Sequence, residues 1–370
     1  MERLLCLAGL LIAVAVMTGP ARAADDGEDV IGGKTVSQWL EVLQDSDQKA
    51  AERRKALLAL GIAGPKPAGV VAGLMAALRK DADAEVRRGA AQTLGGMREE
   101  AKEAVAPLAD ALKTDKADAV REAAAVALGR LGPAAKNAVP ALTAALKDRY
   151  APTRSAAAET LGRLGPEALP ALAALLETLK DPDRIVREYA AYALGRLGSD
   201  ARSAVPKLAD VITHDPHAEV RRAAVEALGR FGADARTAVA SLAKALRDSQ
   251  VDVRRAAARA LDKIGPDAHD ALAALFTALQ DNDKFVRGNA VHAIGRIGKD
   301  GLGKDAPKAV LALVGRLTDV ASEVRCDAAD ELGDMGPQAR AALPALRTAQ
   351  SDTSPAVREA ATAAIKKISP

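Results

Sequence analysis

The stretch VREAAAVALG, residues 120–129, contains the pattern that decides the fold. It opens with Val120 and Arg121, places an alanine three residues after the arginine, and closes with Leu128 and Gly129. The same phrase recurs with limited substitution at spacings of 33 or 34 residues, and once at 38. Its arginines are Arg53, Arg87, Arg121, Arg154, Arg187, Arg221, Arg254, Arg287, Arg325 and Arg358. Such a period is typical of solenoid proteins, and ten copies leave no room for a separate catalytic domain.

Each copy predicts two helices. In the copy that precedes Arg154, Val139, Leu142 and Leu146 lie on one face of a first helix, and Pro140 falls in its first turn, where proline is tolerated. The second helix carries the repeated phrase and ends at a glycine that is often followed by proline, as in Gly165-Pro166. One pair cannot bury its apolar stripes alone, whereas stacked pairs bury them together. The sequence therefore predicts an all-α solenoid of about twenty helices.

The composition agrees with such a fold. Of the 370 residues 49% are hydrophobic but only 2% aromatic, because alanine supplies nearly half of the apolar count and suits close helix packing in thin layers. The 52 basic and 49 acidic residues leave a net charge of +3, too small to indicate a nucleic-acid-binding protein. The two cysteines, Cys6 and Cys326, exclude a disulfide framework and a cysteine metal cluster.

The N-terminal segment has the features of a secretory signal. An uncharged apolar run from Leu4 to Met17 is too short to span a bilayer comfortably, and Ala21-Arg22-Ala23 gives the small-x-small pattern read by signal peptidase. An uncleaved anchor is the alternative. We expect an exported protein, periplasmic or extracellular, divided into a signal peptide (1–23), an acidic linker (24–36) and the repeat solenoid (37–370). Thr35 and Gln38 resemble a capping box at the start of the first helix.

The repeats resemble HEAT repeats, specifically the short HEAT-like repeats grouped with the phycobilisome lyases. The resemblance rests on the two-helix period, an aspartate in the turn and the Val-Arg opening of the second helix. It implies a right-handed superhelical α-solenoid and a structural ladder in which turn aspartates and helix arginines tie each repeat to the next. A carboxylate at the helix entry also accepts backbone N–H groups and pairs with a guanidinium. The ladder residues are Asp148, Arg154, Asp181, Arg187, Asp215, Arg221, Asp248 and Arg254.

The surface of the second helices is where we expect function. With the Val before each arginine numbered 0, positions 0, +4, +7, +8 and +11 form the packing face, and the HEAT resemblance implies that +2, +3, +6 and +10 line a concave surface. We expect a non-catalytic scaffold or adaptor that binds another protein there, although any single position could be plain solvated surface. The partner-binding candidates are Tyr189, Tyr192, Glu226, Arg259 and His292. Tyr189 and Tyr192 are the aromatics that we place within a partner's reach, with partial burial against the next repeat as the alternative.

A basic column at position +10 supports a second hypothesis, an anion-binding module for an acidic polysaccharide or nucleic acid. Its members are Arg130, Arg163, Arg196, Arg230, Lys263 and Arg296. Each cation also lies in the last turn of a helix, where it stabilises the helix dipole, and we favour that simpler explanation. The near-zero net charge and the absence of interleaved aromatic residues argue against nucleic acid.

Catalysis is the least favoured hypothesis. Deoxyhypusine hydroxylases among the HEAT-like enzymes use His-Glu dipeptides to hold iron, but no histidine of this chain precedes glutamate, and a bilin lyase would not carry a signal peptide. His214 and His217 share one turn without a nearby third metal ligand. We expect no catalytic residue, cofactor or metal, and a monomer without a membrane span after signal cleavage. We expect the Gly-rich insertion at 298–307 to be a hinge or contact loop, because it lacks the Gly-Lys-Ser/Thr of a phosphate loop.

Overall fold

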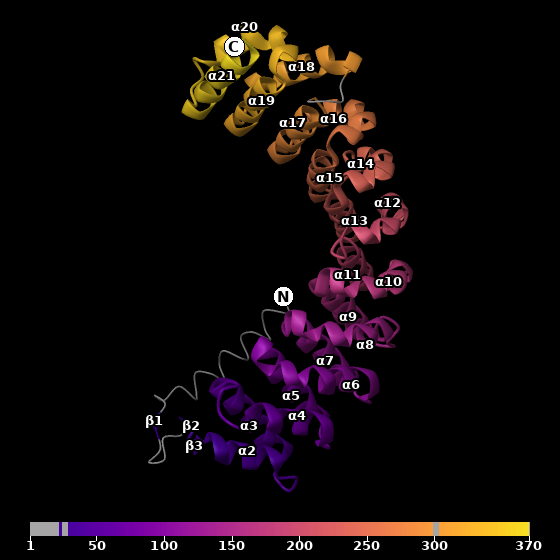
Figure 1. Cartoon of the computed structure of the whole chain (residues 1–370), viewed down its shortest axis with the longest axis vertical. Helices are drawn as coiled ribbons and strands as arrows, with labels where there is room; N and C mark the ends of the chain where they lie inside the picture. Colours follow the sequence, from indigo (N-terminus) through magenta and orange to yellow (C-terminus); the bar gives the residue numbers. More distant parts are fainter. Residues whose placement is uncertain (1–21, 24–28, 299–302, 370) are drawn as a thin grey trace. The chain divides into compact units, whose positions relative to one another are not determined.

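The computed structural model describes residues 22–23, 29–298 and 303–369 (Figure 1). Most of the predicted signal peptide, residues 1–21, and part of the Gly-rich insertion, residues 299–302, lie outside the described residues. The chain divides into two compact units, Met1–Ala174 (unit 1) and Leu175–Pro370 (unit 2). In both units first and second helices alternate along the chain, which confirms the predicted α-solenoid of two-helix repeats.

Ten first helices and ten second helices lie within the described part of the chain. The first helices are α2 (Val36–Gln44), α4 (Val70–Lys80), α6 (Val105–Thr114), α8 (Val139–Ala145), α10 (Leu172–Thr178), α12 (Val205–His214), α14 (Val239–Ala245), α16 (Leu272–Ala278), α18 (Ala306–Val314) and α20 (Leu343–Ala349). The second helices are α3 (Ala50–Ala63), α5 (Ala84–Gly96), α7 (Asp118–Arg130), α9 (Ala151–Leu164), α11 (Arg184–Leu194), α13 (Ala218–Phe231), α15 (Val251–Ile264), α17 (Lys284–Gly298), α19 (Ser322–Asp334) and α21 (Pro355–Ile368). Short 3₁₀ helices such as η5 (Gly232–Ala238) join most repeats.

Local sequence fixes where the second helices begin and end. The side chain of Asp183 accepts hydrogen bonds from the backbone N–H groups of Ile185 and Val186, and so caps the N-terminus of α11. At the other end of these helices, eleven positions after the arginine of the phrase, a glycine of positive φ stands in seven repeats: Gly64, Gly132, Gly165, Gly198, Gly232, Gly265 and Gly336. The second repeat has Arg98 at this position, with a φ of 54°, although the conformation favours glycine.

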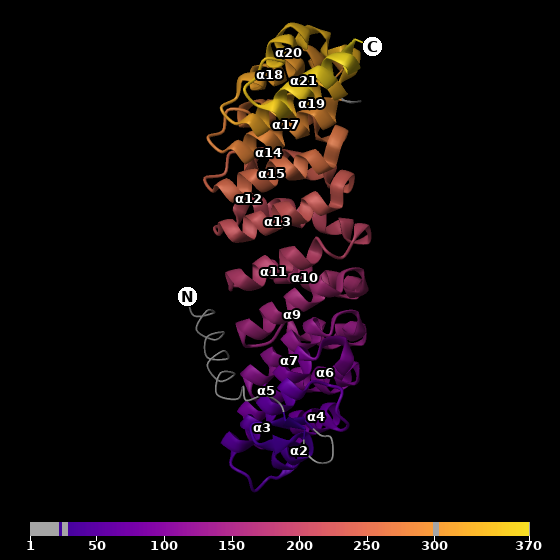
Figure 2. The same ribbon diagram turned by 90° about the vertical axis from the view of Figure 1, so that its left-hand side faces the viewer.

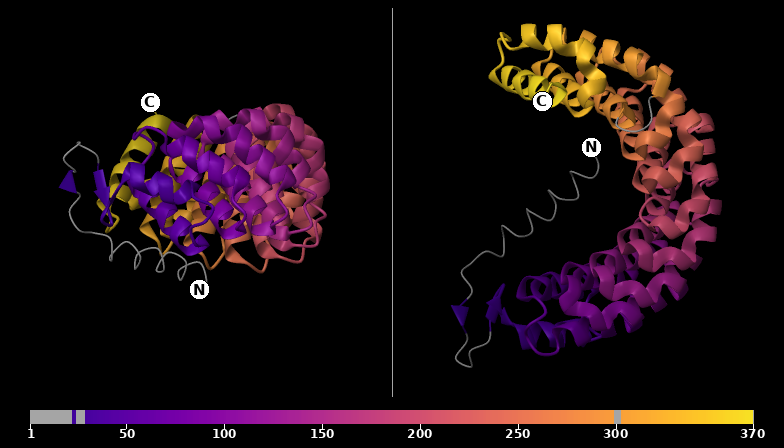
Figure 3. Two further views of the ribbon diagram at one scale, coloured as in Figure 1. Left: turned by 90° about the horizontal axis from the view of Figure 1, so that it is seen from below. Right: turned by 45° about the horizontal axis from the view of Figure 1, so that its top comes forward.

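Within unit 2 the helices form two layers. Figure 1 shows α12, α14 and α16 on one side and α13, α15 and α17 on the other. Figure 2 looks onto the layer of α13, α15 and α17, and the right panel of Figure 3 shows the two layers from another direction. In the layer of second helices α11, α13, α15, α17, α19 and α21 each contact the next. We call this the second-helix layer. The alanine at position +4 is fully buried in all ten repeats, because it faces the neighbouring helices.

A glycine at position +9 brings consecutive second helices into close contact. A Cβ atom added at Gly195 would lie 2.6 Å from the Cα of Ala227, and one added at Gly333 would lie 2.8 Å from the Cα of Ala364. The phrase Leu-Gly-x-Leu-Gly therefore contains two glycines with different roles. The first glycine, at +9, lets the next second helix pack closely, and the second, at +12, takes the positive φ that ends the helix. We predicted only the second of these roles.

Part of the predicted acidic linker is folded, together with Arg22 and Ala23 at the end of the predicted signal peptide. Strands β1 (Arg22–Ala23), β2 (Asp29–Ile31) and β3 (Lys34–Thr35) form an antiparallel sheet in that order. Ile31 is buried, and its carbonyl accepts a 2.7 Å hydrogen bond from the indole N–H of Trp39. Thr35 and Gln38 form the predicted capping box, in which each side chain bonds the other residue's backbone N–H. The sheet therefore covers the start of the first repeat.

None of the helices in the described ranges is both long enough and apolar enough to cross a membrane.

Candidate functional site

The Arg–Asp ladder joins consecutive repeats. Arg287 donates from Nε and Nη2 to the two carboxylate oxygens of Asp319, the turn aspartate of the following repeat, at 2.8 and 2.7 Å. Its Nη1 donates to the backbone carbonyl of Asp281 in its own turn. Equivalent pairs are Arg53–Asp81, Arg87–Asp115, Arg121–Asp148, Arg187–Asp215, Arg221–Asp248, Arg254–Asp281 and Arg325–Asp352. Arg154 and Asp181, which occupy the same positions in their repeats, also have interaction partners.

The ladder aspartates stay ionised because their hydrogen bonds outweigh their burial. Burial alone would raise the pKa of these carboxyl groups, but the arginine and a backbone N–H two residues further along both stabilise the charged form. The pKa therefore lies below its usual range at Asp115, Asp148, Asp215, Asp248, Asp281 and Asp319. Because an arginine and a backbone N–H already bind these carboxylates, we do not place them in a ligand-binding site.

The outer surface of the second-helix layer carries the predicted partner-binding residues. Because positions 0, +4, +7, +8 and +11 of each second helix face the core, +3 and +6 face outward between neighbouring helices. Tyr189 and Tyr192 of α11 and Glu226 of α13 are partly buried, whereas Arg259 of α15 is exposed. These four residues line two adjoining hollows.

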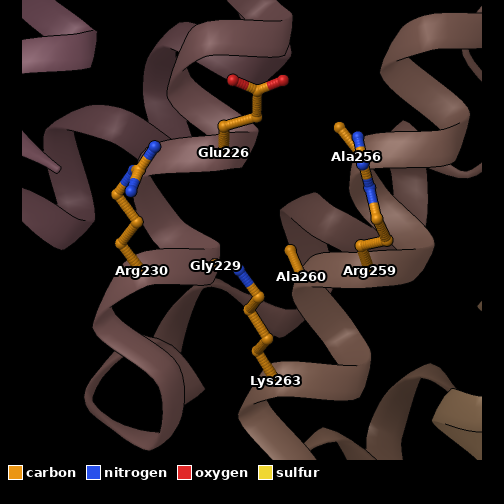
Figure 4. Close-up of a pocket in the computed structure, with 7 residues that line it drawn as sticks. All are labelled: Glu226, Gly229, Arg230, Ala256, Arg259, Ala260 and Lys263. Carbon is orange, nitrogen blue, oxygen red and sulfur yellow. The ribbon is translucent and has the colours of Figure 1, made fainter.

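The first hollow, which we call the cationic hollow, lies between α13 and α15 and has a volume of about 290 Å³. Figure 4 shows Arg230 and Arg259 on opposite sides, with Lys263 between them and Glu226 at one end. Small residues complete the lining: Gly229, Ala256 and Ala260. The hollow thus brings together two predicted partner-binding residues, Glu226 and Arg259, and two members of the basic column, Arg230 and Lys263.

The cationic hollow has an excess of positive charge. Among the described residues, no carboxylate forms an ion pair with Arg230, Arg259 or Lys263. Its one acidic residue, Glu226, accepts a 2.8 Å hydrogen bond from Arg222, which also lies 3.3 Å from Glu188. Most other arginines of this layer are neutralised by neighbours, so three cations without a carboxylate partner around one hollow are a ready site for an anionic group.

The second hollow, which we call the tyrosine hollow, lies between α11 and α13 and has a volume of about 110 Å³. Its lining residues are Glu188, Tyr189, Tyr192, Arg222, Ala223, Glu226, Ala227 and Arg230. The two tyrosine rings meet edge to face at 86°, with centroids 6.4 Å apart, and the guanidinium of Arg196 lies 6.0 Å from the ring of Tyr192. Arg230 and Glu226 line both hollows, so the two adjoin across α13.

His292, the fifth predicted partner-binding residue, lies outside both hollows. Its Nδ1 is 2.9 Å from a carboxylate oxygen of Glu331 and its Nε2 is 3.5 Å from one of Asp327, both on α19. Hydrogen bonds to Asp327 and Glu331 raise the pKa of His292 to about 10. The imidazolium therefore links two repeats, and the structure does not bring it together with the other four candidates.

The basic column is exposed but not uniform. Arg163 pairs with Glu159 at 2.7 Å, Arg296 lies 3.4 Å from Asp262, and Arg196 stacks on Tyr192. Arg130 and Arg163 belong to unit 1, and the other four members to unit 2. Arg130, Arg163, Arg230, Lys263 and Arg296 do lie in the last turn of their helices, as the helix-dipole explanation expects. Arg196 follows the end of α11.

Sequence reasoning missed two features of this surface. Phe285 is 56% exposed at the start of α17, with Arg255 and Lys284 5.0 and 5.3 Å from its ring. Our expectation that Tyr189 and Tyr192 are the only aromatics within reach of a partner is therefore wrong, and the expectation for the two tyrosines themselves stays a prediction. The second feature is the pairing of Arg222 with Glu226 and Glu188; the i, i+4 spacing of Arg222 and Glu226 on one helix is a signal that could have shown the first contact.

No group of three or more potential metal-ligating side chains occurs among the residues that the structure describes. His214 is exposed and lies 2.9 Å from the carboxylate of Asp210, whereas the ring of His217 contacts Arg187. The two histidines are thus engaged with different neighbours.

Known proteins share this architecture. HEAT-repeat models match residues 36–129, 105–178, 172–262 and 239–325. No curated protein is similar enough to count as a relative. A crystal structure of an engineered protein is 24% identical and has a TM-score of 0.62, covering 90% of this chain and 99% of that one. A chain from a structure of Kap95p bound to RanGDP is 17% identical, with a TM-score of 0.58, and the match covers 90% of this chain and 50% of that one.

At these identities the likeness to solved structures shows the fold alone. The family models go further, because together they match residues 36–325 without a gap. The chain belongs to the HEAT-repeat family.

Proposed function

We propose that this protein is a non-catalytic, exported scaffold that binds another protein through the second-helix layer of unit 2. The single observation that carries the proposal is the groove made by the cationic and tyrosine hollows, where cations without a carboxylate partner lie beside two partly exposed tyrosines. Arginine and tyrosine dominate the binding energy of many protein interfaces. HEAT-repeat folds commonly present such extended surfaces to protein partners.

A pull-down from the periplasmic or secreted fraction tests the proposal. The wild-type chain should recover a defined partner, and the double variant Tyr192→Ala with Arg259→Ala should recover much less. The matched control is Arg149→Ala with Tyr150→Ala, which also removes one exposed arginine and one tyrosine, but from a turn in unit 1. Equal recovery by the wild type and the groove variant would contradict the proposal.

The exported location rests on the N-terminal sequence alone. Export should remove residues 1–23, so the mature protein would begin at Ala24. Mass spectrometry of the protein from the exported fraction measures this directly, and a protein that retains Met1 in the cytoplasm would contradict it. The repeated Val-Arg phrase also supports assignment of the repeats to the short, phycobilisome-lyase type.

The second candidate function is an anion-binding module for an acidic polysaccharide or nucleic acid. Arg230 and Lys263 of the basic column line the cationic hollow, which favours this alternative over a column that only caps helices. Binding to a heparin-like polymer would then fall steeply with salt and disappear when Arg163, Arg196 and Arg230 are replaced by glutamine. A flat salt dependence would eliminate it.

A further inference from the structure

The two hollows form one groove with two chemically different ends. Arg230 and Glu226 project from α13 and line both hollows, so no other helix separates them. The end at α15 carries Arg259 and Lys263, and the end at α11 carries the two tyrosines. A ligand that fills the groove must therefore satisfy cations on one side of α13 and aromatic rings on the other.

The cationic end selects carboxylates. Two guanidinium groups and one ammonium surround a hollow lined by Gly229, Ala256 and Ala260, whose small side chains leave room for a carboxylate to reach the cations. Guanidinium groups bind carboxylates with two parallel hydrogen bonds. Glu226 is the one carboxylate in the lining, so the three cations exceed it by two charges, and a single carboxylate of a ligand would leave one of them unmatched. The end at α15 therefore suits two neighbouring acidic side chains.

The tyrosine end selects an apolar side chain. Ala223 and Ala227 at its base are 6% and 1% exposed, and the rings of Tyr189 and Tyr192 form one wall. The charges at its rim balance, because Arg222 and Arg230 stand against Glu188 and Glu226, and Arg222 contacts both carboxylates. An aliphatic or aromatic side chain gains dispersion and hydrophobic contact there without leaving an unpaired charge.

The spacing of the helices fixes the spacing of these groups in a ligand. The hollows lie on either side of α13, so they are separated by one interhelix spacing, about 8–10 Å for packed helices. A peptide in the extended polyproline II conformation advances about 3.1 Å per residue and presents every third side chain to the same face. The apolar side chain and the first acidic side chain would thus lie about three residues apart.

We propose that the groove between α11 and α15 binds an extended acidic peptide segment of a partner protein, with adjacent Asp or Glu side chains on Arg230, Arg259 and Lys263 and an apolar side chain about three residues away in the tyrosine hollow. This inference rests on the proposed function, because it names the chemistry of the partner at the same groove. It goes beyond that function by giving a sequence pattern that can be selected for.

Selection from a random peptide display library on the purified full chain tests the pattern. Enriched peptides should contain paired Asp or Glu residues about three positions from Leu, Ile, Phe, Tyr or Trp. The strongest peptide, synthesised with a fluorescent label, should lose at least about tenfold in affinity when Arg230, Arg259 and Lys263 become glutamine. The control Arg236→Gln removes an exposed arginine of η5 outside both hollows and should change affinity less than about twofold.

A mutant cycle separates the two ends of the groove. Tyr192→Ala should weaken binding of the selected peptide, yet leave unchanged the binding of the same peptide with glycine in place of its apolar residue. Enrichment of peptides without an acidic excess, no enrichment at all, or equal binding by the triple glutamine variant would overturn the inference. Tight binding to heparin without selection for an apolar residue would overturn it in favour of a polyanion site.

The two proposals fail separately. A partner recovered through Tyr192 and Arg259 that contains no acidic segment at its contact site would preserve the proposed function and overturn the inference. Equal recovery of the partner by the wild type and the groove variant, together with successful selection of acidic peptides, would do the reverse.

Discussion

The Arg287–Asp319 pair provides a direct measure of how strongly neighbouring repeats are joined. Its side chains are 9% and 3% exposed, and two charge-assisted hydrogen bonds of 2.7 and 2.8 Å connect them. Arg287→Ala removes both bonds and leaves a buried carboxylate without its main partner. Breaking a buried pair in this way costs about 3–5 kcal/mol. Because Arg316 lies 3.5 Å from the same carboxylate and can partly replace the lost cation, we expect about 3 kcal/mol.

The chain supplies a matched control for this variant in its last repeat. Arg358 occupies the same position and donates to the backbone carbonyls of Asp352 and Thr353, but it forms no ion pair with a carboxylate among the described residues. Arg358→Ala should therefore cost only about 1 kcal/mol, from the backbone hydrogen bonds that both variants lose.

Urea unfolding followed by far-UV circular dichroism, with amide hydrogen exchange of α17 and α19, measures the difference between the two variants. Adding Asp319→Ala to Arg287→Ala should recover part of the loss, because the unpaired buried charge is removed. Equal destabilisation by Arg287→Ala and Arg358→Ala would refute the argument that the ladder joins repeats.

Three further predictions follow from the repeat geometry. Gly195→Ala should destabilise the fold by about 1–3 kcal/mol in urea unfolding, since its Cβ would lie 2.7 Å from that of Ala227, whereas Gly96→Ala, which meets nothing within 4 Å, should be neutral or stabilising. Arg98→Gly should raise the unfolding free energy by about 1 kcal/mol by relieving the positive φ, and Arg98→Ala should not. His292 has a pKa raised to about 10, so its stabilising contribution is complete below the unfolded value of about 6.5 and is lost as the pH rises through about 10. The urea midpoint should fall over that range more in the wild type than in His292→Gln, and an imidazole NMR titration near pH 6.5 would contradict the assignment.

Much of the fold was predictable because each repeat presents the same residue types at the same positions. The fully buried alanine at +4 and the Asp–Arg spacing recur ten times, so the packing face and the ladder positions stand out against the variable surface. The same register predicts that Tyr192, Glu226 and Arg259, all at +6, lie on neighbouring helices of one layer. Their convergence at two hollows follows from that register and from small neighbours such as Gly229.

The repeat pattern could not predict which charged side chains on the surface form ion pairs with one another. His292 appears in the same column as Arg259, yet it pairs with acidic residues of the next repeat. The one sequence signal was Glu331, which replaces the alanine usual at +7 and lies against Gly295. Phe285 was not expected within a partner's reach, because it directly precedes the phrase, outside the positions assigned to the surface.

Site-specific photo-crosslinking at position 192 tests the central claim most directly. A benzophenone amino acid in place of Tyr192 would place the reactive group in the tyrosine hollow, and the same group in place of Leu311 provides a control on α18, where that side chain is 72% exposed in the layer of first helices. We predict that position 192, and not position 311, captures one defined protein in the native compartment, through a segment rich in Asp and Glu. Capture of the same proteins from both positions, or of none from position 192, would contradict the claim that this groove is the binding site.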